Sequence, residues 1–184
     1  MKIRKGFVSN SSSASFIVEV KGTFNDLIPV LYENIFTLEK CISLLEKKIE
    51  MDQQWKVPTK DASDRQKAFF LDELNQLENR IQELKNYKPI DWIKIKGTNI
   101  KEEELARLKE KHHQKRVVKD ALEALNWTVS QIDDGYVSFN AGGTSCYNGW
   151  ENIVLHKELI ELIGFFTFMK YELRTRIEHH EGSF

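Results

Sequence analysis

The stretch IPVLYENIFTLEKCISLLEKKI, residues 28–49, has the most regular pattern in this chain of 184 residues. Its apolar side chains recur alternately three and four positions apart, at Ile28, Leu31, Ile35, Leu38, Ile42, Leu45 and Ile49. This a/d spacing is typical of helices that pack along their length, and it is sustained here for about three heptads. The pattern predicts a helix with a narrow apolar seam.

A second helical seam follows a polar break. Residues 56–61 interrupt the first pattern, because Pro58 disfavours helix in the residue before it. The second seam consists of Phe70, Leu74, Leu77, Ile81 and Leu84. Two seams of similar length predict an antiparallel, coiled-coil-like helical hairpin over 23–88. Two alternatives remain open: separate packing of each helix on a sheet, and pairing of the seams between two chains as a homodimer.

The rest of the chain predicts a small, mainly antiparallel sheet. Alternating residues indicate strands at 15–20, 127–132 and 136–140, and the Asp-Gly pair at 134–135 is typical of a hairpin turn. A last helix, from about residue 152 or 156 to 177, is apolar on most sides and is expected to pack on the sheet. The predicted fold class is therefore α+β. Its parts are 1–22 (first strand), 23–88 (hairpin) and 89–184 (the rest of the core, with a strand at 92–96 and a helix at 100–125).

Composition limits the classes of protein. The formal charge of −1 argues against a surface devoted to binding phosphates, and two distant cysteines exclude a disulfide framework. The most apolar helical region, 159–169, is too short to span a bilayer. Serines follow the basic N-terminus where a signal peptide needs an apolar segment. We therefore expect a cytoplasmic protein that does not enter a membrane.

The first sixteen residues, MKIRKGFVSNSSSASF, contain a serine-rich segment, here called the serine box (residues 6–16). The box resembles the GFVSNSSSSSF segment at the start of many small proteins of bacteriophages and prophages, with Ala14 where that pattern has serine. The resemblance implies a phage or prophage origin and transfers no catalytic residue. If the chain is encoded by a phage, the expected location is the host cytoplasm.

Serine and asparagine side chains also favour turns, and successive exposed N–H groups can hold an anion. The box therefore allows two interpretations. It is either a polar turn that leads into the first strand, or a recognition, modification or anion-binding segment. The candidate binding residues of the second interpretation are Ser9, Asn10, Ser11, Ser12, Ser13 and Ser15.

The most basic segment lies within the predicted helix at 100–125. Its candidate nucleic-acid contacts are Arg107, Lys111, Lys115, Arg116 and Lys119. Such a face can bind phosphates, but a solvated helix face balanced by Glu102, Glu103 and Glu104 explains the same residues.

Other reactive residues form no recognised motif. Cys146 with His156 matches no nucleophile signature, and Gly142-Gly143 lacks the spacing and the lysine of a nucleotide-binding loop. The adjacent pairs at 112–113 and 179–180 lack the spacing of a helical metal site, so we expect solvated histidines. We therefore assign no catalytic residue, metal ligand or cofactor.

The leading functional hypothesis is a non-enzymatic accessory protein of phage type that binds a host or virion protein. The alternative is nucleic-acid binding through the basic face at 107–119.

Overall fold

The computed structural model describes residues 12–88, 101–132, 134–145 and 157–181. These residues form five helices and one four-stranded sheet, which confirms the α+β class. The chain divides into two units. One is a sheet unit that combines Met1–Thr23 with Asn126–Phe184, and the other is a helical unit, Phe24–Leu125.

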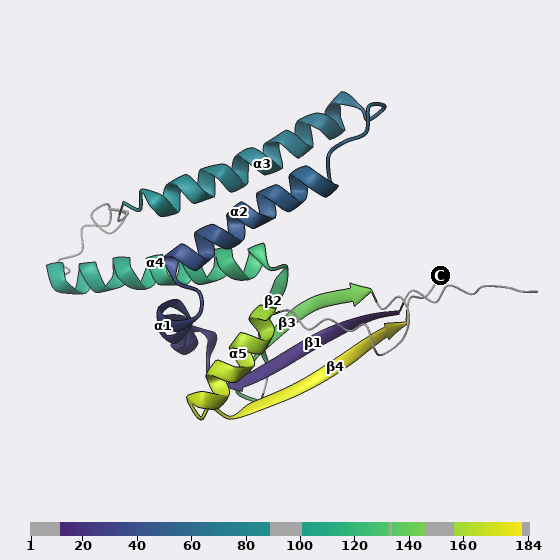
Figure 1. The fold of residues 1–184 in the computed structure, drawn as a ribbon. Helices are drawn as coiled ribbons and strands as arrows, with labels where there is room; N and C mark the ends of the chain where they lie inside the picture. The colour runs from purple at the N-terminus through teal and green to yellow at the C-terminus, as the bar shows by residue number, and fades with distance from the viewer. Residues whose placement is uncertain (1–11, 89–100, 133, 146–156, 182–184) are drawn as a thin grey trace, which may run out of the picture. The chain divides into compact units, whose positions relative to one another are not determined.

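The sheet unit contains β1 (Ser12–Lys21), β2 (Trp127–Ile132), β3 (Tyr136–Ser145) and β4 (Leu173–Glu181). The strand order is β2-β3-β1-β4, and every neighbouring pair is antiparallel (Figure 1). The expected hairpin joins β2 to β3. Its turn needs glycine because Gly135 has a φ of 82°.

Residues 15–20 of β1 are all buried, on both faces of the sheet, and one of these faces packs against a helix. Phe16, Val18 and Val20 alternate along β1, and Val18 lies opposite Phe139 of β3. Helix α5 (Lys157–Phe168) packs on this face, with the Phe166 ring centroid 6.2 Å from that of Phe139. The prediction that the last helix packs on the sheet is therefore confirmed.

The end of α5 differs from its expected position. The helix was expected to continue to Ile177, but it stops at Phe168, and β4 begins at Leu173. Lys170 has a φ of 58°, and the Tyr171 N–H donates to the Phe166 carbonyl at 2.9 Å, so the chain reverses there. The expectation was wrong because the open edge of β1 supplies backbone partners for β4, and a local pattern does not reveal such partners.

Charged side chains hold β4 at the end of the sheet. Lys21 pairs with Glu172 at 2.7 Å, and Arg174 pairs with Asp134 at 2.5 Å. The Arg174 guanidinium also lies 3.9 Å from the centre of the Tyr136 ring. These contacts join β4 to residues that are distant in sequence and favour a single register.

The serine box enters the sheet earlier than expected. The strand was predicted to begin at Ser15, whereas β1 begins at Ser12 and pairs with β3 on one side and β4 on the other. Polar residues can occupy this strand because ladder hydrogen bonds satisfy the backbone whatever the side chains are. Ser9, Asn10 and Ser11 lie outside the described residues.

The helical unit contains α1 (Phe24–Asn34), α2 (Leu38–Trp55), α3 (Asp64–Lys85) and α4 (Glu102–Ala124). The seam from Ile28 to Ile49 is divided between α1 and α2. Thr37 caps α2 by accepting a hydrogen bond from the Lys40 N–H at 3.2 Å. Ile35 and Phe36 are buried at the break, so the apolar spacing continues although the helix does not.

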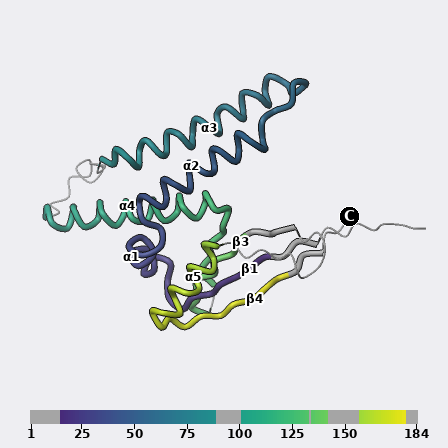
Figure 2. Tube along the Cα trace, in the orientation of Figure 1, coloured from purple at the N-terminus to yellow at the C-terminus, as the bar shows by residue number. Residues whose placement is uncertain are grey.

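Helices α2 and α3 run antiparallel and side by side (Figures 1 and 2). The Lys85 ammonium lies 3.1 Å from the Glu46 carboxylate across this pair. Apolar residues of both seams are buried within the one chain: Ile28, Leu31, Ile35, Leu45, Leu74, Leu77, Ile81 and Leu84.

Helix α4 packs on α1 and α2. Its buried residues are Val117, Val118, Ala121 and Leu122, together with His113 and Asp120. The helical unit therefore extends to Leu125, whereas the sequence assigned residues beyond 88 to the other part. The predicted strand at 92–96 lies outside the described residues.

Candidate protein-contact site

The connection between α2 and α3 has a locally defined structure. Pro58 lacks a backbone donor, and the Ala62 N–H donates to the Thr59 carbonyl at 3.0 Å, which forms a turn. Ser63 and Gln66 then form a capping box: the Gln66 side chain accepts from the Ser63 N–H at 2.9 Å, and Ser63 Oγ accepts from the Gln66 N–H at 3.3 Å. We call residues 51–73, around this connection, the hairpin tip.

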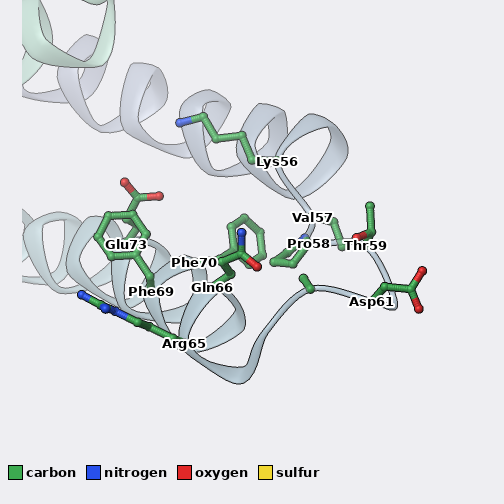
Figure 3. Close-up of a pocket in the computed structure, with 11 residues that line it drawn as sticks. Lys56, Val57, Pro58, Thr59, Asp61, Arg65, Gln66, Phe69, Phe70 and Glu73 are labelled. Atoms are coloured by element: carbon green, nitrogen blue, oxygen red, sulfur yellow. The ribbon is translucent and has the colours of Figure 1, made fainter.

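An open groove of about 700 Å³ lies at the hairpin tip (Figure 3). Phe69, Phe70, Val57 and Pro58 contribute apolar surface, and Figure 3 shows Phe70 beside Pro58. The other lining residues are Lys56, Thr59, Asp61, Ala62, Arg65, Gln66 and Glu73. An apolar floor with a charged rim can accept a protein side chain or a short segment.

Large apolar side chains are concentrated and exposed at the hairpin tip. Trp55 is 76% exposed and Phe69 64%, and Met51, Val57 and Leu71 are each more than half exposed. These five are half of the ten large apolar side chains found exposed among the described residues. Of these five, Val57 and Phe69 line the groove. Exposed apolar residues at a groove are typical of contact surfaces, where tryptophan often contributes strongly to binding.

The rim of the groove carries both signs of charge. Lys56 lies 2.9 Å from the buried Asp52 carboxylate, and that hydrogen bond raises the pKa of Lys56. The lining residues include two cations, Lys56 and Arg65, and two carboxylates, Asp61 and Glu73. The groove therefore favours a partner with paired charges over one that is strongly acidic or basic.

Sequence reasoning did not identify the hairpin tip. A usable signal was present, because Phe69 and Leu71 flank the seam residue Phe70 without belonging to the seam. Trp55 likewise falls outside the heptad positions. Large apolar residues left over after a helix seam has been assigned are candidates for external contacts.

The serine box divides between described and undescribed residues. Ser12, Ser13 and Ser15 lie in β1, and Ser15 is 5% exposed. The backbone of this part of the box takes part in the strand ladder, so its N–H groups are not arranged as a free anion-binding loop.

The basic face of α4 is partly engaged inside the helical unit. Lys115 donates to Asn25 at 3.4 Å, and Arg116 pairs with Glu83 and lies 3.7 Å from Asp120. Arg107, Lys111 and Lys119 are exposed. The first two line a second groove, of about 420 Å³, together with Asp26 and Glu110. Carboxylates beside these cations weaken the positive potential that phosphate binding requires.

A partly buried ionic network joins α3 to α4, with Asp120 buried and Glu123 exposed. Arg80 donates to both Glu123 oxygens at 2.9 and 2.8 Å and to Asp120 at 2.5 Å. These hydrogen bonds lower the pKa of Glu123 and raise that of Arg80. The nearby Cys41 is fully buried, and burial raises the pKa of its thiol to about 12, which makes it a poor nucleophile.

The histidine pair at 112–113 is split between two environments. His112 is exposed, whereas His113 is 5% exposed, so the expectation of solvated histidines is wrong for His113. Its ring stacks on Tyr87 at 3.9 Å between centroids and meets Tyr32 edge-on at 6.0 Å. Burial lowers the pKa of His113.

The hairpin tip is the main candidate site, and the remaining candidate residues form no site among the residues described. Cys146 and His156 lie outside the described residues, and no group of three or more potential metal ligands occurs within the described part of the chain. None of the helices described is long and apolar enough to cross a membrane. No family model, curated protein or solved structure matches this chain.

Proposed function

We propose that this chain is a non-enzymatic accessory protein of phage type that binds a host or virion protein through its hairpin tip. The observation that supports this most is the exposure of Trp55 and Phe69 at the hairpin tip, where Phe69 lines the groove. Exposing these two rings to water is unfavourable, so the complex with a protein partner that covers them is stabilised by burial of their apolar surface. The phage origin is supported only by the resemblance of the serine box.

The nucleic-acid alternative has less support. Two of its five cations, Lys115 and Arg116, are engaged with residues of α1 and α3. A phosphate ligand would have to compete with those contacts, whereas a partner at the hairpin tip covers side chains that are already exposed.

The proposal is tested by capture from a bacterial host lysate with the full-length chain as bait. We expect wild type to retain a partner at physiological salt, and the Trp55→Ser/Phe69→Ser double variant to lose it. Leu108→Ser is the matched control, because Leu108 is also an exposed apolar residue but lies on α4. Circular dichroism checks that the variants fold. Equal capture by wild type and the double variant, or no capture by wild type, would contradict the proposal.

A further inference from the structure

We propose that the hairpin tip also binds a second copy of this chain, with the two α3 helices antiparallel about a two-fold axis beside Phe69. This inference rests on the proposed function, since it uses the same surface and names one of its partners. Covering the exposed rings in this way protects an apolar surface that would otherwise promote aggregation.

Three residues form a regular pattern along one face of α3. Arg65, Phe69 and Glu73 are spaced four residues apart, so they share one face, about 6 Å apart along the axis. Figure 3 shows the three side chains along this helix. The face therefore presents a cation, an aromatic ring and a carboxylate in order.

This pattern is symmetric about Phe69. In an antiparallel pair centred on Phe69, a residue four positions before the centre faces a residue four positions after it. Arg65 then meets the partner's Glu73, Glu73 meets the partner's Arg65, and the two Phe69 rings meet at the axis. Both charge pairs are attractive, as a self-complementary two-fold interface requires.

Arg65 and Phe69 are exposed and Glu73 is half-exposed, so all three can be reached without unfolding the helical unit. Phe69 is 64% exposed, and Arg65 forms no ion pair with any residue that the structure describes. The seam residues Leu74 and Leu77 are already buried within the chain. Self-association through the seams would have to open the helical unit, whereas association through the hairpin tip leaves it intact.

The test is sedimentation velocity of the full-length chain from about 1 μM to 1 mM, a range suited to a small and weak interface. We expect a concentration-dependent dimer in wild type. Phe69→Ser, Arg65→Glu and Glu73→Arg are each expected to weaken it about tenfold or more, because they remove the central ring or place like charges together. Arg107→Glu, a charge reversal on α4, is the matched control and leaves the dimer unchanged.

Mixing two variants gives the decisive comparison. An Arg65→Glu chain and a Glu73→Arg chain each repel their own copies, but together they restore two attractive pairs. We expect the equimolar mixture to associate at least about tenfold more strongly than either variant alone. A monomeric wild type, a dimer insensitive to Phe69→Ser, or a mixture no stronger than its components would overturn the inference. If wild type is monomeric but still captures a lysate protein through the tip, only this inference fails and the proposed function stands.

Discussion

Two phenylalanines of α5 provide a sharp test of how the sheet unit is stabilised. Phe166 is fully buried and its ring lies near those of Phe139 and Tyr171, whereas Phe168, two residues later, is 80% exposed. Truncating a buried phenylalanine to alanine costs about 3–5 kcal/mol, since apolar burial is lost and a cavity remains. The same change at an exposed site costs within about 0.5 kcal/mol. Phe166→Ala should therefore destabilise the sheet unit strongly, and Phe168→Ala should not.

Urea unfolding measures this difference. With a slope of about 2 kcal/mol per molar urea, the Phe166→Ala midpoint should fall by about 1.5–2.5 M, and that of Phe168→Ala by less than about 0.3 M. Fluorescence reports tertiary structure, and hydrogen exchange of β1 and β3 amides assigns the effect to the sheet unit. A Phe166→Ala loss below about 1 kcal/mol, or equal losses in the two variants, would refute the packing of α5 on the sheet.

Three further predictions concern the network, the buried histidine and two glycines. Arg80→Ala should lower the free energy of unfolding by about 1–3 kcal/mol, because it removes the hydrogen-bonded partner of the buried Asp120 and leaves only Arg116, 3.7 Å away. Thermal unfolding measures this, and Arg65→Ala, which removes an exposed arginine, is expected to have little effect. The depressed pKa of His113 means that the unfolded chain binds this proton more readily, so stability is full above about pH 6.5 and falls as pH drops towards the folded pKa. The difference in free energy of unfolding between pH 7.5 and pH 5.5 should be smaller in His113→Phe than in wild type, and His112→Phe is the exposed control. If this difference is unchanged in His113→Phe, the pH dependence does not come from His113. Gly135→Ala should destabilise by about 1 kcal/mol because of its positive φ, whereas Gly164→Ala, in open space on α5, should stabilise by about 0.5–1 kcal/mol. Calorimetric shifts of the same sign for both glycines would contradict this reasoning.

Local patterns predicted the elements that depend on local interactions. The strands around Gly135 were expected because a tight turn and alternating residues specify a hairpin within a few positions. The helices α2 and α3 were expected because their seams and the Pro58 break are all short-range signals. The break before α2 was not expected, because the apolar spacing continues through it and only the Thr37 capping hydrogen bond marks the start of the new helix.

The candidate site was less accessible from sequence. Phe69 and Trp55 contribute to it through their exposure, and exposure depends on what the rest of the fold leaves uncovered. The engagement of Arg116 with Glu83 of α3 likewise depends on the packing of α4 in the helical unit. A basic run in sequence therefore overstated the free positive charge on this helix.

The sequence by itself determined the α+β class, the two seams, the β2–β3 hairpin and the residues that close its turn, since each depends on neighbours within a few positions. Tertiary structure decided that residues 173–181 form β4, because a strand needs a partner edge that β1 provides from the other end of the chain. It also decided that α4 joins the helical unit and that the hairpin tip stays exposed. Segments that are distant in sequence bury one another, and no local pattern predicts which of these segments come into contact.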